Sequence, residues 1–127
     1  MDLKDKEKVV KIIGNADILL EELEKNIKDK EKKEDKQLLK SIQYSLDILK
    51  TNPFNGYPVP NKLWPKEFQD LPNLFRMELS QFYRLLYYVK GNENIVVSVV
   101  FEIVDHKKYN KIFGYRKKWK LKLNLKN

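Results

Sequence analysis

The sequence predicts a small α+β domain. We expect a short N-terminal strand and an αα-hairpin, then a twisted antiparallel sheet of three to four strands with a short C-terminal helix. Apolar residues recur every three or four positions in the first half of the chain, as in amphipathic helices, and every second position after Pro72, as in half-buried strands. The chain has 127 residues, enough for one domain with a modest core. A single domain over residues 1–127 is therefore expected.

The N-terminal elements follow from a change of period. Residues 9–13 are mostly β-branched and precede Gly14, which predicts a short strand that ends there. A helix continuing through this segment is the alternative, and Gly14 argues against it. From Ala16 onward the apolar residues have helical spacing, so we expect an amphipathic helix over residues 16–27. Asn15 stands just before it and is the expected N-cap.

A second helix completes the hairpin. Residues 28–37 are almost wholly charged and are expected to form an exposed helix end or a turn. The next apolar stripe, flanked by Leu39 and Tyr44, predicts a helix over residues 38–50. Pro53 limits this helix, because the residue before a proline is disfavoured in the α conformation.

Residues 53–72 contain all five prolines of the chain, which predicts an irregular crossing segment. The segment also carries large apolar residues, which are Phe54, Tyr57, Leu63, Trp64 and Phe68. A flexible linker would not carry so many of them. We therefore expect the segment to pack against the domain.

Three strands are predicted in the second half of the chain, over residues 74–79, 82–90 and 95–104. The first alternates, so that Arg76 and Glu78 share one face while Phe75 and Met77 share the other. The third is apolar on both faces and is expected to be the central strand. A short helix over residues 105–113 should follow, with Asp105 as N-cap and Gly114 near its end.

The C-terminal part carries the whole formal charge of the protein. Residues 105–127 hold nine Lys or Arg against one acid, and the formal net charge of the chain is +8. Aromatic residues are interspersed with these cations. This combination favours a polyanion partner, first RNA or DNA, because rings stack on bases where charge meets phosphate. A basic tail over residues 116–127 that only aids solubility is the alternative. The candidate RNA-binding residues are Lys108, Lys111, Arg116, Lys117 and Lys118.

Several classes of site are disfavoured by composition. The chain has no cysteine and one histidine, so a disulfide framework or a thiolate metal site is excluded, and we expect no metal and no cofactor. It has neither a phosphate-binding glycine loop nor a Gly-x-Ser-x-Gly motif. The N-terminus lacks the apolar core of a signal peptide, and the longest apolar run is too short to span a bilayer. A cytoplasmic protein without a membrane partner is expected.

The position of Arg84 depends on the turn before it. A two-residue turn at residues 80–81 pairs Arg84 with Met77 and directs it away from Arg76. A three-residue turn or a bulge places Arg84 opposite Glu78, on the face of Arg76. An ion pair between Arg84 and Glu78 is the structural alternative to a functional role, since an unpaired charge among apolar neighbours would be costly.

His106 and Tyr109 follow the last strand. His106 can act as a general acid or base near neutral pH, although a lone histidine at a helix start is more often structural or simply exposed. Tyr109 lies three residues later, on the same expected helical face. It can stack on a base, act in acid–base chemistry, or cap the core.

The pattern as a whole resembles the RelE/ParE toxin superfamily. Residues 49–56, LKTNPFNG, are similar to the hinge after the family's second helix, and 74–79, LFRMEL, with 82–87, FYRLLY, look like its paired basic strands. Residues 103–109, IVDHKKY, resemble its closing motif. The similarity runs from about Val9 to Tyr115, and residues 83–87 are its most specific part. The ending HKKYNKIFGY looks like an archaeal branch of the group.

This resemblance implies a RelE-like toxin that enters the ribosomal A site and cleaves mRNA, a metal-independent endoribonuclease held by a cognate antitoxin. By position, Arg76 and Arg84 match the basic strand residues. Lys107, beside His106, matches the basic residue after the last strand, and Tyr109 is the nearest match to the aromatic residue. The antitoxin is expected along the helix pair and the sheet, with its acidic residues on the basic end.

Two departures from the family pattern leave other functions open. Glu78 stands where ribonuclease members carry a cation, and Tyr109 comes sooner after His106 than in many members. A catalytically silent RNA- or DNA-binding protein and a ParE-like topoisomerase inhibitor are the alternatives. Convergence of Arg76 and Arg84 on Tyr109 would favour the ribonuclease, and Arg84 locked to Glu78 would favour the silent protein.

Overall fold

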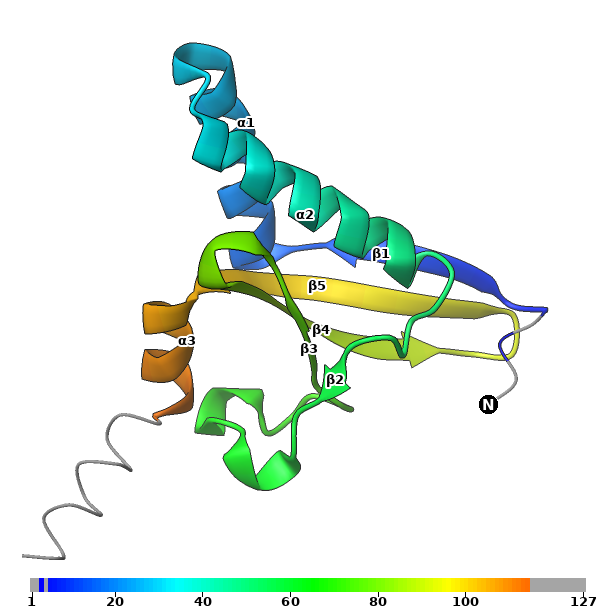
Figure 1. The fold of residues 1–127 in the computed structure, drawn as a ribbon. Helices are drawn as coiled ribbons and strands as arrows, with labels where there is room; N and C mark the ends of the chain where they lie inside the picture. Colours follow the sequence, from blue (N-terminus) through cyan, green and yellow to red (C-terminus); the bar gives the residue numbers. More distant parts are fainter. Residues whose placement is uncertain (1–2, 4, 115–127) are drawn as a thin grey trace, which may run out of the picture.

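The computed structural model describes residue 3 and residues 5–114, which form a mixed sheet between two layers (Figure 1). The helices are α1 (Gly14–Lys30), α2 (Lys33–Leu49) and α3 (His106–Phe113). The strands are β1 (Glu7–Ile12), β2 (Tyr57–Pro58), β3 (Phe75–Glu78), β4 (Tyr83–Gly91) and β5 (Ile95–Asp105). Helices α1 and α2 lie on one side of the sheet, and α3 lies on the other together with the crossing segment.

The α+β class is confirmed, but the sheet is larger than predicted and is mixed. It has five strands in the order β1-β5-β4-β3-β2, and β1 runs parallel to β5. The antiparallel part, β2 to β5, has four strands, and the sequence did not indicate that the N-terminal strand β1 joins the same sheet in parallel. Strand β2 pairs only Tyr57 with Arg76 and Pro58 with Phe75. A strand of two residues within a proline-rich segment leaves no recognisable strand pattern in the sequence. Strand β5 is interior, as its apolar faces indicate, although β4 takes the middle position.

Both helices of the hairpin begin earlier than predicted. Ile13 occupies the N-cap position of α1, and the side chain of Asn15 instead donates a hydrogen bond from Nδ2 to Glu102 Oε1 at 2.6 Å. The prediction of Asn15 as N-cap is therefore wrong. Helix α2 begins at Lys33, because the charged residues before its apolar stripe are themselves good helix formers. Tyr44, which flanks the apolar stripe of α2, is exposed.

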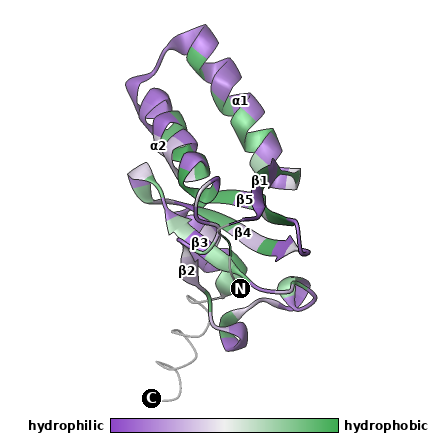
Figure 2. Ribbon diagram, turned by 90° about the vertical axis from the view of Figure 1, so that its right-hand side faces the viewer, coloured by the Kyte–Doolittle hydropathy of each residue, from purple (hydrophilic) through white to green (hydrophobic). Residues whose placement is uncertain are grey.

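Two apolar cores lie on opposite faces of the sheet. The larger joins α1 and α2 to the sheet through residues such as Leu23, Ile42 and Leu85. The smaller lies under α3 and the crossing segment, and its buried residues are Val59, Leu74, Leu86, Val104, Tyr109 and Phe113. Figure 2 shows the hydrophobic residues concentrated on the central strands and hydrophilic residues at the connection between α1 and α2.

The crossing segment packs against the domain, as predicted. Trp64 Nε1 donates a hydrogen bond to the carbonyl of Val59 at 2.8 Å, and the ring of Phe68 lies edge-on to that of Phe101 with centroids 5.3 Å apart. At its start, Tyr87 Oη donates to the carbonyl of Pro53 at 2.8 Å and accepts from the amide of Gly56 at 2.9 Å. The bonds of Tyr87 fix the start of the segment to β4, and the Phe68–Phe101 contact packs its later part against β5.

Helix α3 has the predicted caps. Asp105 Oδ1 accepts a hydrogen bond from the amide of Lys108 at 2.8 Å, and Gly114 closes the helix with φ +68°. None of the described helices is long and apolar enough to cross a membrane. The predicted basic tail over residues 116–127, with Arg116, Lys117 and Lys118, lies outside the described residues.

Candidate functional site

The turn between β3 and β4 decides where Arg84 lies. It is a three-residue turn, Ser80–Phe82, in which the amide of Leu79 donates to the carbonyl of Tyr83 at 2.9 Å. The strand register therefore pairs Glu78 with Arg84 and Arg76 with Leu86. This is the second of the two geometries that the sequence left open, and it places Arg84 on the same face as Arg76.

Glu78 bridges the two arginines. Its Oε2 lies 3.1 Å from Arg84 Nε and its Oε1 lies 3.6 Å from Arg76 Nε. The side chains are partly exposed, at 20% for Arg84, 31% for Arg76 and 50% for Glu78. Water screens such pairs, so each contributes about 1 kcal/mol or less to stability. These ion pairs therefore add little to folding stability, and their main effect is to fix where the charges lie.

Tyr109 lies beneath both guanidinium groups. Its ring is fully buried and is stacked on Phe113 with centroids 4.4 Å apart. Arg84 Cζ lies 4.2 Å from the ring centroid, and Arg76 Nη1 donates a hydrogen bond to Tyr109 Oη at 3.1 Å. A cation over an aromatic face is stabilised by roughly 0.5–2 kcal/mol. The ring supports Arg84 through its face and Arg76 through its hydroxyl.

The arginine cluster, which we define as Arg76, Glu78, Arg84 and Tyr109, can hold an anion. Arginine donates N–H groups in a fixed fork that fits a carboxylate or a phosphate. Glu78 now supplies the carboxylate, so a phosphate entering the cluster would compete with it for both guanidinium groups. Arg84 therefore contacts both Tyr109 and Glu78. The first contact favours the ribonuclease, and the second favours the catalytically silent protein.

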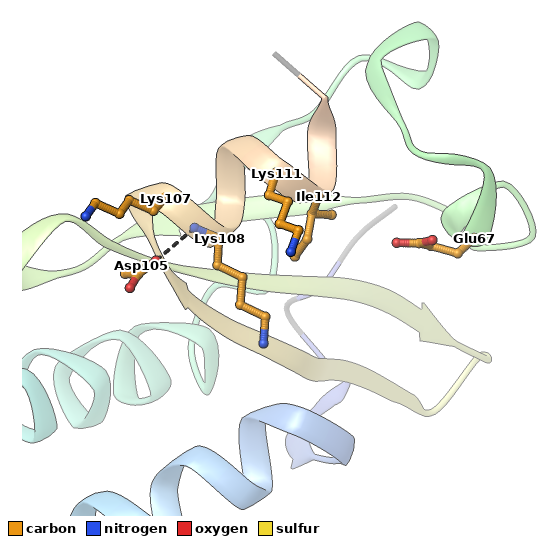
Figure 3. A pocket seen from close by; sticks show the side chains of 6 residues that line it. All are labelled: Glu67, Asp105, Lys107, Lys108, Lys111 and Ile112. Atoms are coloured by element: carbon orange, nitrogen blue, oxygen red, sulfur yellow. Dashed lines mark hydrogen bonds between the residues drawn. The ribbon is translucent and has the colours of Figure 1, made fainter. Parts of the chain in front are cut away.

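A second basic feature lies at the start of α3. A hollow of about 670 Å³ is lined by Glu67, Asp105, Lys107, Lys108, Lys111 and Ile112. Figure 3 shows Lys107 extending to one side of α3, Lys108 and Lys111 to the other, and the carboxylate of Glu67 facing the helix. The register pairs Arg84 with Val104 and Tyr83 with Asp105, so the helix begins beside the strand that carries Arg84. The lysine-lined hollow and the arginine cluster share no lining residue, but α3 connects them because it carries both the lysines and Tyr109.

The neighbourhood of Asp105 affects one further phenol. The pKa of Tyr83 is raised above its usual value, first by burial and then by the negative charges of Asp105 and Asp35. Tyr83 therefore stays protonated near neutral pH and adds no charge to this region.

His106 is not part of the arginine cluster. It is exposed, and its Nε2 lies 3.1 Å from Nδ2 of Asn110 one turn later. The structure therefore separates His106 from the buried ring of Tyr109, although the spacing placed them on one helical face. Within residue 3 and residues 5–114, no group of three or more His, Asp or Glu is placed to hold a metal ion.

Sequence reasoning missed a pair of hollows beside the cluster. One, of about 350 Å³, lies between α2 and β3, and the other, of about 260 Å³, lies along the crossing segment. Arg76 and the exposed Tyr57 border both, and the exposed Tyr44 borders the first. The available signal was Tyr44, a large ring beside a polar helix face.

Comparison of the chain with models of known protein families, with curated proteins and with solved structures finds no match. The resemblance to the RelE/ParE superfamily therefore stays a prediction from residue pattern.

Proposed function

We propose that the protein is a RelE-like toxin that binds RNA and cleaves mRNA on the ribosome. The observation that carries this proposal is the convergence of Arg76 and Arg84, from neighbouring strands, on one carboxylate above a buried tyrosine. Such a pair of guanidinium groups suits the charge that develops on a phosphate during cleavage. The cognate antitoxin remains a prediction from the resemblance alone.

The chemistry assigns a different task to each member of the cluster. The 2′-hydroxyl oxygen attacks the neighbouring phosphorus, and the bond from phosphorus to the 5′-oxygen breaks. Arg76 and Arg84 stabilise the negative charge on the phosphate oxygens, while Tyr109 acts as a positioning residue that holds both of them. Arginine is a poor proton acceptor, and Glu78 is the carboxylate that contacts both arginines. It is our candidate acceptor of the 2′-hydroxyl proton, and solvent returns a proton to the leaving oxygen.

The lysines of α3 extend the site. Lys107, Lys108 and Lys111 are exposed around the hollow beside β5, where they can contact phosphates of the same RNA strand. Contacts of this kind release counterions, so RNA affinity should fall steeply as salt rises. His106 is exposed at the start of α3. It can contact substrate from the solvent, but it is not part of the arginine cluster.

A catalytically silent RNA-binding protein is the second candidate. It is favoured by the ion pairs of Glu78, which neutralise one of the two arginine charges. In this case the cluster and the lysines would bind the RNA backbone without cleaving it.

The experiment adds purified protein to a translating extract and maps new mRNA ends by primer extension. We expect cleavage by the wild type, and a rate about 10²–10³-fold lower for Arg84→Ala, the effect of losing one electrostatic stabiliser. Lys25→Ala is the matched control, because it removes an exposed cation on α1, which packs on the face of the sheet opposite Tyr109 and the two arginines. RNA binding that depends on Arg84 without any cleavage would leave the silent protein. Absence of both binding and cleavage would refute the proposal.

A further inference from the structure

The turn between β3 and β4 has an unfavourable backbone conformation. Its residues Gln81 and Phe82 both have positive φ, at 59° and 61°. L-residues disfavour this region because Cβ approaches the following carbonyl oxygen, and a bulky aromatic residue there is a clear outlier. Turns with two such central residues strongly prefer Asn-Gly. The chain therefore gives up stability by placing phenylalanine at this position.

Contacts with α2 hold the turn in place. The amide of Ser80 donates to Ser41 Oγ at 3.2 Å, and Gln81 Nε2 donates to the carbonyl of Glu34 at 2.6 Å. Such strain persists only where several contacts hold the backbone in place, and it is most common at functional sites. The turn is thus a fixed feature of the fold.

The side chain of Phe82 has no packing role that would explain the strain. Phe82 is 82% exposed, more than any other large apolar residue in the part of the chain that the structure describes. Burial of apolar area stabilises a fold only in proportion to the area removed from water, so this ring contributes little. The structure places a rigid aromatic face in solvent at a conformational cost.

The backbone of Phe82 lies close to the arginine cluster along the chain. Glu78 and Arg84 are the strand pair nearest the turn, and Phe82 precedes Arg84 by two residues. Two residues span at most about 7 Å of chain, so the backbone of Phe82 lies within that distance of Arg84. A nucleotide bound by its phosphate at the cluster would have neighbouring bases within reach of the ring.

We propose that Phe82 is a stacking platform for an unpaired base of single-stranded RNA whose phosphate is held by Arg76 and Arg84. This inference rests on the proposed function and names the form of RNA that the site takes. Unpaired bases stack on exposed aromatic side chains, whereas the paired bases of a duplex do not present a free face. The nearby guanidinium groups and the lysines of α3 favour a polyanion over an apolar protein surface.

The test uses two properties that should move in opposite directions. In Phe82→Gly the strain is relieved, so the melting temperature should rise, while affinity for a fluorescent unstructured oligoribonucleotide should fall about tenfold or more. Phe82→Trp should retain the affinity. Glu31→Gly is the matched control, because Glu31 also has positive φ, at 50°, in the connection between α1 and α2. It should raise stability without changing affinity.

An oligoribonucleotide with abasic sites identifies the interaction as stacking. It should bind the wild type as weakly as the complete oligoribonucleotide binds Phe82→Gly, and the substitution should not weaken it further. Equal affinity of wild type and Phe82→Gly for the complete oligoribonucleotide would overturn the inference and leave the proposed function standing. If Phe82→Gly lost the binding of a protein partner while its RNA affinity stayed unchanged, the ring would be assigned to that partner instead. A wild type that binds no RNA would refute both proposals.

Discussion

Strands β3 and β4 present two different surfaces to the two sides of the sheet. On the side of α1 and α2, Met77, Leu85 and Tyr87 are buried in the larger core. On the other side, the alternate positions include Arg76 and Arg84, which are partly exposed. Because successive side chains of a strand point to opposite faces, one short stretch of chain supplies both surfaces. Residues that stabilise the core therefore alternate along each strand with residues that carry charge. Substitutions on the two faces should accordingly have separable effects.

The largest effect is expected from Leu85→Ala on the helix-covered face. Leu85 is fully buried, and truncation of such a side chain costs about 2–5 kcal/mol, since it removes apolar contacts and leaves a cavity. Urea denaturation followed by circular dichroism measures the change. RNA affinity per folded molecule should be unchanged. A loss below about 1 kcal/mol would mean that the helix pair is not the main source of stability.

A smaller effect is expected from Tyr87→Phe, on the same face. The change removes the hydroxyl that contacts Pro53 and Gly56, which should cost about 1–3 kcal/mol because the carbonyl and amide lose a buried partner. Burial raises the pKa of Tyr87 to about 12, although the Gly56 amide lowers it in part. The unfolded chain loses this proton near pH 10 while the folded protein retains it.

The pH dependence of this contribution follows directly. The stabilisation by Tyr87 should be complete below about pH 10 and should be lost as the pH rises toward 12, since the unfolded state then binds fewer protons than the native state. Chemical denaturation of wild type and Tyr87→Phe at several pH values measures the difference. A difference that stays constant up to pH 12 would contradict the assignment. Comparison with the variant cancels the titration of lysines, which both proteins share.

The smallest effect on stability is expected from Glu78→Gln, on the arginine face. Loss of its partly exposed ion pairs should cost less than about 1 kcal/mol. RNA affinity should rise about two- to fivefold, because the carboxylate charge that competes with phosphate is removed. This change in affinity corresponds to the energy of the lost ion pairs. The cleavage rate should fall, because Gln does not accept the 2′-hydroxyl proton. Filter binding and primer extension measure the two quantities separately.

A different outcome would change the interpretation of Glu78. A loss of stability well above 1 kcal/mol with no change in RNA binding or cleavage would make Glu78 a structural partner of Arg84. Arg76→Lys is a useful comparison, since it keeps the positive charge on the same strand and removes the forked geometry.

Much of the fold was accessible from local pattern. Helical spacing located both helices of the hairpin, alternation located β3, and apolar runs between turn residues located β4 and β5. Asp105 and Gly114 were identified as the caps of α3, because capping depends on residues next to one another in the chain. Long-range pairing was not accessible in this way. Strand β1 joins the sheet only by pairing with β5 in parallel, from Glu7 with Ile95 onward, and no local signal specifies such a partner.

The amino-acid sequence by itself determined which residues could form a basic site, namely Arg76 and Arg84 with Tyr109 and the lysines of α3. Their arrangement was decided by tertiary structure. The face taken by Arg84 depends on one residue in the turn, because a strand's side chains reverse face at every step. That turn adopts positive φ at Gln81 and Phe82, which local preference opposes, and contacts with α2 hold it there. Packing of α3 on the sheet then buries Tyr109 beneath the two arginines, a placement that depends on contacts between residues far apart in the chain.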